Sequence, residues 1–86
     1  MKKKIDLIKK MLQNKSGRIE QIKVFQELIW NDNHPNSILS ELAYDLDFYE
    51  PNEELRKEDP SYYGDEKLER MLNVIIINLQ GKEVHG

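Results

Sequence analysis

The fold is decided by residues 41 to 72, ELAYDLDFYEPNEELRKEDPSYYGDEKLERML, which hold the end of one helical pattern, a connection and the start of a second helical pattern. Pro51 disfavours the α-helical region at Glu50, so the first of these helices is expected to end close to Tyr49 or Glu50. The connection after it, up to about residue 64, is expected to lack regular structure. It crowds like charges beside tyrosines, which an ordinary loop does not require, so we expect the segment to serve an interaction.

Two more helical patterns precede this stretch. Apolar residues recur at helical spacing from about residue 3 to 14 and from about residue 18 to 31. The sequence NDNHPN, residues 31 to 36, is typical of a turn, because asparagine and aspartate bond locally to the backbone. The third helix therefore starts after this turn and ends close to Tyr49 or Glu50, before the proline.

The fourth helix follows the connection. Asp65 is expected to cap it and Gly81 to stop it. The run from Val74 to Ile77 has β propensity, but the flanking LERMLN favours a helix. The sequence therefore predicts an all-α fold, a small antiparallel four-helix bundle that forms one domain over residues 1 to 86.

One apolar stripe on each helix is expected to enter a common core. The stripes contain Ile5, Ile8, Met11, Leu12, Ile22, Phe25, Ile29, Ile38, Leu39, Leu42, Ala43, Leu46, Tyr49, Leu68, Met71, Leu72, Ile75 and Leu79. Tyr44 and Phe48 lie four residues apart on the opposite side of the third helix, so they are expected to be adjacent and to face away from the core. The connection either leaves these rings exposed or folds over them. We expect the connection to pack on the surface and not to be disordered, because Leu55, Tyr62 and Tyr63 give it apolar anchors.

Size and composition set the class of protein. The chain has 86 residues and 38% hydrophobic content, enough for one modest core. It has no cysteine, which excludes a disulfide framework and a thiolate metal site. Lys9 and Lys10 stand where a signal peptide needs its apolar run, and no apolar stretch approaches the roughly 20 residues that span a bilayer. We therefore expect a soluble, cytoplasmic protein.

The charges are segregated along the chain. Residues 1 to 23 hold eight bases and two acids, a net charge of +6, whereas residues 41 to 69 hold eleven acids and three bases, a net charge of -8. Segregation of this kind affects the choice of partner and the association rate more than it affects the fold. One part of the chain suits a polyanion and the other a polycation.

The residues that catalysis requires are missing or badly placed. The histidines are His34, in a turn, and His85, one residue from the end of the sequence. Nucleophilic catalysis needs a base beside an activated nucleophile, and neither histidine is well placed for this role. The carboxylates show no Glu-x-x-His pair of the di-iron kind. Gly17 and Gly64 stand alone and form no phosphate-binding loop. The protein is therefore expected not to be an enzyme and to use no cofactor and no metal.

The stretch from residue 41 to 72 resembles the colicin D immunity protein-like family of small bacterial immunity proteins. In that family a helix ends in an aromatic-Glu-Pro triplet, a polar connection with an arginine and a tyrosine follows, and the next helix alternates acidic and apolar residues. This chain has the triplet at Tyr49, Glu50 and Pro51 and an acid at Asp47, one helical turn before Glu50. It departs at Asn52, where the family's namesake has an aspartate, which is a reason against an identical toxin partner. The earlier order of helices also agrees, so the resemblance covers most of the chain.

The resemblance implies that the protein binds and neutralises the nuclease domain of a cognate bacterial toxin, a ribonuclease that cleaves tRNA. A site that cleaves tRNA must be basic to hold phosphates, so a dense carboxylate surface can occupy it in place of RNA. We call the expected contact residues the acidic surface. They are Tyr44, Asp45, Asp47, Phe48, Glu50, Asn52, Glu53, Glu54, Tyr62 and Tyr63. On this interpretation the partner is the basic nuclease domain, with no direct contact to nucleic acid or membrane.

Other functions stay open at this point. The basic first helix suits a nucleic-acid-binding protein, although no helix-turn-helix signature follows it and the calculated pI is near 5.4. A regulatory protein that mimics DNA differs from the immunity protein in its partner rather than in its physics. A solvated acidic face without any partner is the remaining alternative. The sequence also leaves open whether the toxin is a bacteriocin or belongs to a contact-dependent growth inhibition system.

Overall fold

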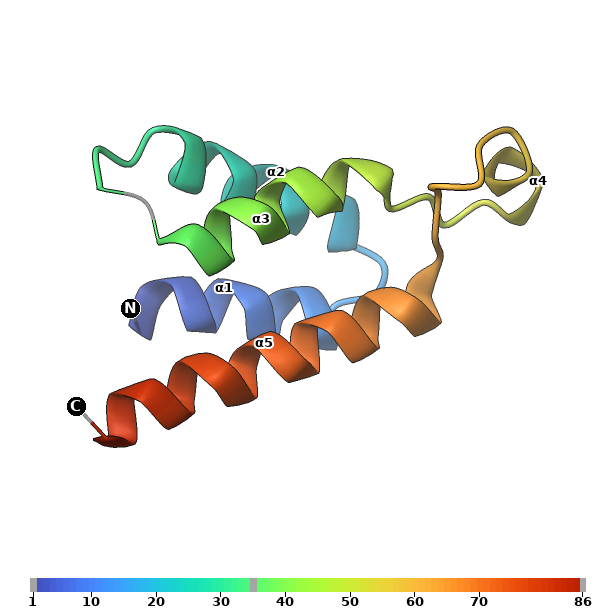
Figure 1. The fold of residues 1–86 in the computed structure, drawn as a ribbon. Helices are drawn as coiled ribbons and strands as arrows, with labels where there is room; N and C mark the ends of the chain where they lie inside the picture. The colour runs from blue at the N-terminus through green and yellow to red at the C-terminus, as the bar shows by residue number, and fades with distance from the viewer. Residues whose placement is uncertain (1, 35, 86) are drawn as a thin grey trace.

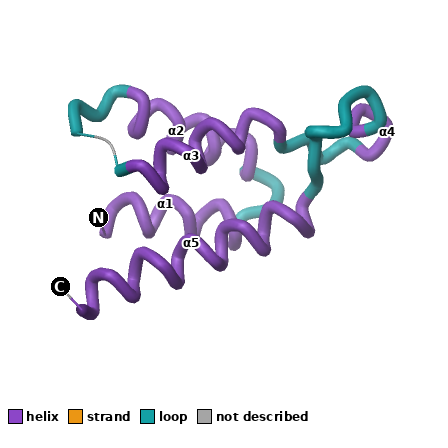
Figure 2. The backbone as a smooth tube through the Cα atoms, in the orientation of Figure 1, coloured by secondary structure: helices purple, strands orange, loops and turns teal. Residues whose placement is uncertain are grey.

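The structure is a computed structural model that describes residues 2 to 34 and 36 to 85, with side chains as far as residue 81. The described part is helical and contains no strand, which confirms the all-α prediction (Figure 2). The elements are α1 (Lys2–Gln13), α2 (Arg18–Trp30), α3 (Ser37–Asp45), the 3-10 helix η1 (Leu46–Phe48), α4 (Glu53–Arg56) and α5 (Asp65–His85) (Figure 1).

Each long helix packs against at least one other long helix. Helix α1 contacts both α2 and α5, and α2 contacts α3. The molecule measures 43 by 24 by 22 Å. Helix α4 stands at one end, on an excursion of the chain between α3 and α5, and both chain ends lie at the opposite end (Figure 1). The connection that the sequence singled out therefore forms one tip of the protein.

The core is built mostly from the predicted apolar stripes, and Tyr63 and Ile76, which lie outside those stripes, join it. Its buried residues are Ile5, Ile8, Met11, Ile22, Phe25, Ile29, Leu39, Leu42, Ala43, Leu46, Tyr63, Leu68, Leu72, Ile76 and Leu79. Leu12, Tyr49, Met71 and Ile75 are half-buried against this core. Burial at intervals of three and four residues explains why these segments are helical, because each helix gains most of its stability by burying one face.

The third helix ends differently from the prediction. The α-helix stops at Asp45, the chain tightens into η1, and Tyr49 is extended, with φ -72° and ψ 121°. Tyr49 forms a parallel bridge with Tyr63. The Glu50 N–H donates to the Tyr63 carbonyl at 2.8 Å, and the Tyr63 N–H donates to the Phe48 carbonyl at 3.1 Å. These backbone bonds close the connection at its base, and the preference for extended backbone before Pro51 allows them.

The connection also contains a helical turn, so the prediction that it lacks regular structure is wrong. Asn52 caps α4, since its side-chain oxygen accepts hydrogen bonds from the N–H groups of Glu54 and Leu55. Asparagine is a favoured N-cap for this reason. Leu55 is 41% exposed and no residue of α4 is buried, so Leu55 does not anchor the connection as expected. Of the three predicted anchors, only Tyr63 is buried, and Tyr62 is half-buried.

Helix α5 is longer than predicted. Gly81 lies inside the helix, which continues to His85, and Val74 to Ile77 are helical. A single glycine costs a helix about 1 kcal/mol relative to alanine, which is too little to stop a helix that continues on both sides. Asp65 is the first residue of α5, and its carboxylate is directed at partners on other elements.

Candidate functional site

Two of the exposed acids of the acidic surface lie at the tip formed by α4. Glu53 and Glu54 occupy the first turn of α4, where carboxylates are favoured by the helix dipole, and both side chains are exposed. Glu54 faces Lys57 at 3.3 Å, but the two side chains are 81% and 68% exposed. Ion pairs this exposed are worth little, so both carboxylates of α4 remain available to a partner.

Two other acids of this surface are held by the fold itself. Gln26, a buried residue of α2, donates hydrogen bonds from Nε2 to the Ala43 carbonyl at 2.9 Å and to the Asp47 carboxylate at 2.8 Å. The Glu50 carboxylate accepts a hydrogen bond from the Asn52 N–H at 3.1 Å. Asp47 is exposed and Glu50 is half-buried. These carboxylates are therefore oriented before any partner arrives, and changing them disturbs the fold locally.

Tyr44 and Phe48 form an aromatic pair beside the acids. Their ring centroids are 5.6 Å apart with an interplanar angle of 63°, an edge-to-face arrangement. Tyr44 is 63% exposed, so the connection leaves this ring uncovered. The prediction that Phe48 faces away from the core is wrong, because η1 rotates it and it packs half-buried against the core. Phe48 therefore lies between the exposed Tyr44 ring and the core.

Tyr63 belongs to the interior more than to the acidic surface. It is 7% exposed, and its hydroxyl donates a 2.7 Å hydrogen bond to the Asp45 carbonyl. Burial raises the pKa of Tyr63, and the nearby Asp45 and Asp47 carboxylates add to the shift. The expectation that Tyr63 offers a partner a large contact area does not fit this burial. Its role in the structure is to fasten the end of the connection to the end of α3.

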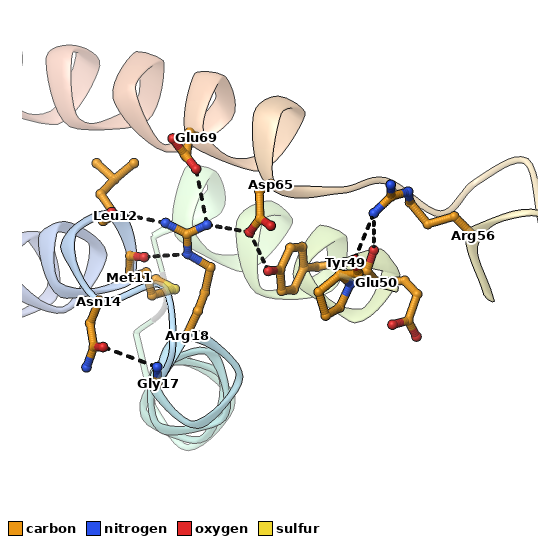
Figure 3. Close-up of polar contacts among 11 residues, drawn as sticks. Met11, Leu12, Asn14, Gly17, Arg18, Tyr49, Glu50, Arg56, Asp65 and Glu69 are labelled. Atoms are coloured by element: carbon orange, nitrogen blue, oxygen red, sulfur yellow. Dashed lines mark hydrogen bonds and ion pairs between the residues drawn. The ribbon is translucent and has the colours of Figure 1, made fainter. Parts of the chain in front are cut away.

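A polar cluster around the buried Arg18 was not predicted from the sequence (Figure 3). Arg18 opens α2 and is 1% exposed. Its guanidinium donates to the carbonyls of Met11 and Leu12 at the end of α1, at 2.7 and 3.0 Å. It also donates to the carboxylates of Asp65 and Glu69 in α5, at 2.5 and 3.2 Å. One side chain thus joins the ends of three helices.

Asp65 extends this cluster to the aromatic-Glu-Pro triplet. Its Oδ1 atom accepts hydrogen bonds from both Arg18 and the Tyr49 hydroxyl, which lies 2.5 Å away (Figure 3). Desolvation opposes ionisation of Asp65, but the bonds from Tyr49 and Arg18 outweigh it, and the pKa of Asp65 lies below its usual range. Burial, followed by the bond to Asp65, raises the pKa of Tyr49 to about 12. The tyrosine is therefore a neutral donor to a charged carboxylate.

Arg56 holds the connection from inside. Its Nη1 atom donates to the carbonyls of Glu50 and Pro51, at 2.9 and 3.2 Å (Figure 3). A Cβ atom added at Gly64 would lie 2.5 Å from the same Nη1 atom. Gly64 therefore leaves the room that the Arg56 guanidinium occupies. Arg56 closes the turn of the triplet onto α4, and this leaves the acids of α4 on the outside.

Residues 1 to 23, which carry a net charge of +6 in the sequence, expose fewer free bases in the folded protein than the sequence suggests. Arg18 is buried, and Lys4 forms a 2.7 Å ion pair with Asp32. The bases that remain exposed are Lys2, Lys3, Lys10, Lys15 and Lys23. The one sequence signal for the Arg18 cluster was the i, i+4 pair of acids at Asp65 and Glu69, which brackets Leu68 on the buried face of α5.

Known proteins add no further candidate. No family model, no curated protein and no solved structure matches this chain. Among the residues that the structure describes, no group of three or more histidine, aspartate or glutamate side chains is arranged to hold a metal ion. Within the same residues, no helix is both long and apolar enough to cross a membrane.

Proposed function

We propose that this protein is an immunity protein that binds a cognate bacterial nuclease toxin and covers its basic active site with the acidic surface. The observation that carries the proposal is the exposure of the carboxylates at the tip formed by α4 and the end of α3, beside the exposed ring of Tyr44. Carboxylates on a projecting tip suit a cleft lined by lysine and arginine, because they can enter it in place of phosphates.

The internal bonds of the tip support the same proposal. The Tyr49–Tyr63 bridge, the Asn52 cap and the Arg56 side chain order the connection without using the exposed acids of α4. An ordered tip loses little conformational entropy on binding, which favours high affinity. A solvated loop without a partner has no need of this many fixed contacts.

The finer features of the proposal follow from the resemblance described above. The toxin would be a ribonuclease that cleaves tRNA, and the protein would act in the cytoplasm, where tRNA is the target. It would act by binding, not by catalysis. The pairwise contacts of α1 with α2 and α5, and of α2 with α3, support an antiparallel four-helix bundle as the scaffold for the tip.

The test starts from the reading frame beside the gene. The C-terminal domain encoded by a large adjacent frame is expressed in cells with and without this protein, and survival and tRNA integrity are measured. The proposal expects tRNA cleavage and death without the protein, and intact tRNA and survival with it. An adjacent frame without a basic nuclease domain contradicts the proposal. So does the death of cells that express this protein, if the purified protein is folded and does not bind the nuclease domain.

A further inference from the structure

A hollow of about 370 Å³ opens beside the acidic surface, between the end of α3, the connection and α5. We call it the aromatic socket, and its walls include Tyr44, Asp45, Phe48, Tyr63 and Lys67. A second hollow of about 400 Å³ is lined by Tyr44 and Asp45 together with Glu41. Tyr44 and Asp45 border both hollows, so a side chain that enters from either direction meets an aromatic ring and a carboxylate.

The Tyr44 ring is exposed but held in place. Its edge-to-face contact with Phe48, at 5.6 Å between centroids, fixes it against a residue that packs on the core. Aromatic pairs of this kind contribute stabilising free energy in addition to that of their buried area. A ring that is fixed before binding offers contact area without a further loss of side-chain entropy. The wall of the socket is therefore preorganised.

The socket already contains one contact between a cation and an aromatic ring. The Lys67 ammonium lies 5.4 Å from the centroid of the Tyr63 ring. A cation at this distance from a ring is attracted by its quadrupole. In the part of the chain that the structure describes, Tyr44 has no such cation, although Asp45 lies beside it and Glu41 is one helical turn away. The Tyr44 ring and the nearby carboxylates are therefore suited to a cationic occupant.

We propose that the aromatic socket receives an arginine side chain of the basic partner protein. This inference rests on the proposed function and adds that the contact selects arginine over lysine. A guanidinium group is planar and weakly hydrated, so it stacks on a ring and pairs with a carboxylate at the same time, whereas an ammonium group is compact and strongly hydrated. Tyr44 supplies the ring and Asp45 supplies the carboxylate.

Lys67 limits the affinity of the socket. Its ammonium lines the same hollow as Tyr44 and repels a second cation. Removal of this charge by Lys67→Gln is expected to strengthen binding of any cationic occupant. This effect has the opposite sign to the effect of Tyr44→Ala or Asp45→Asn, so a general loss of folding cannot imitate the full pattern.

The test compares nona-arginine with nona-lysine, which carry equal charge, by calorimetric titration of the full-length protein at low salt. The wild-type protein is expected to bind nona-arginine more tightly, and the ratio of the two affinities is expected to fall by about two- to fivefold in Tyr44→Ala and in Asp45→Asn. Tyr44→Phe keeps the ring and should keep the ratio. Lys67→Gln should raise the affinity for both peptides.

The matched control is Trp30→Ala, which removes an aromatic side chain of similar exposure, 57% compared with 63% for Tyr44. Trp30 ends α2, at the turn that lies opposite the α4 tip (Figure 1). A ratio that is unchanged in Tyr44→Ala, or that falls equally in Trp30→Ala, overturns the socket. Circular dichroism of each variant confirms that it is folded.

The peptide test does not involve the toxin, so the two proposals can fail separately. If the arginine preference depends on Tyr44 but the protein does not protect cells, the proposed function is wrong and the socket still binds arginine. If the protein protects cells and Tyr44→Ala binds the toxin domain as tightly as the wild type does, the toxin does not use the socket and the inference is wrong.

Discussion

Arg18 joins three helices through one guanidinium group. It lies at the start of α2, donates to two carbonyls at the end of α1, and pairs with two carboxylates of α5. Burying an arginine is costly unless its donors are satisfied, and here the carbonyls and carboxylates satisfy them. Because Asp65 also holds the Tyr49 hydroxyl, the position of the triplet before the connection depends on this cluster.

Arg18→Ala should therefore destabilise the protein strongly. It leaves the Asp65 carboxylate without its main partner and opens a cavity between α1, α2 and α5. We expect the free energy of unfolding to fall by roughly 2 to 4 kcal/mol. This is somewhat less than the roughly 3 to 5 kcal/mol for breaking a fully buried ion pair, because Asp65 and Glu69 retain some exposure. Urea denaturation followed by circular dichroism measures the change. The exposed Arg70→Ala variant is the control and should change stability by about 0.5 kcal/mol or less.

Asp65 gives the stability of the protein a dependence on acid pH. Its pKa in the folded state is lower than the usual value of 3.8, so the unfolded chain takes up the proton first as the pH falls. The stabilisation is fully present above the unfolded pKa and is lost as the pH falls through the folded pKa, that is, below about pH 4. In Asp65→Asn the loss of stability between about pH 4 and pH 2 should be smaller than in the wild type. The free energy of unfolding is measured by urea melts at each pH. If it falls equally steeply with pH in the two proteins, other carboxylates carry the acid dependence.

At the scale of elements, hydrophobic spacing predicted α1, α2 and the body of α5, because each of these helices buries one continuous stripe. Helix α4 has no stripe and no buried residue, and only its Asn52 cap marks it. The end of α3 depends on the pairing of Tyr49 with Tyr63, two residues that are distant in sequence. Helix α5 continues through Gly81 because one glycine is a weak stop signal. The sequence-based prediction was therefore wrong for α4, for the end of α3 and for the end of α5, where local sequence signals are weak or a distant residue decides the backbone structure.

Tyr63 is the residue that fastens the connection, so Tyr63→Ala should release it. The variant loses a buried ring and the bond to the Asp45 carbonyl, at a cost of about 3 kcal/mol. The amide of Glu50, which donates to the carbonyl of residue 63, should exchange its hydrogen about tenfold faster or more, while the amides inside α1 and α2 should change much less. Hydrogen exchange read by mass spectrometry tests this. Leu55→Ala, which removes an exposed side chain of the same connection, should leave Glu50 protected.

At the scale of the whole molecule, the charge asymmetry of the sequence survives only in part. The acids of α4 and Asp45 are exposed, whereas folding removes Arg18 and Lys4 from the set of free bases. The candidate acidic surface was predictable because crowded carboxylates stay in solvent. The roles of Tyr63 and Asp47 were not, because each depends on a bond to a residue that is distant in the sequence.

Charge reversal on α4 tests the acidic surface without disturbing the core. Asp47 and Glu50 make internal hydrogen bonds, so the cleaner change is Glu53→Lys with Glu54→Lys, in a helix that has no buried residue. If these acids enter a basic cleft, the affinity for the toxin domain should fall by about 10- to 100-fold at low salt, mainly through the association rate, and the loss should shrink as salt screens the charges. Surface plasmon resonance at two ionic strengths measures both effects.

The matched control makes the same change of charge on another face. Glu20→Lys with Glu27→Lys also replaces two exposed glutamates by lysines, on α2, and Glu20 lies in the first turn of its helix as Glu53 does. Because α2 does not carry the acidic surface, this variant should lose little affinity. An equal loss in both variants would mean that the toxin senses only net charge. Full affinity in the α4 variant would move the interface away from the tip, and the exposed apolar residues Val74 and Ile77 of α5 would become the next face to change.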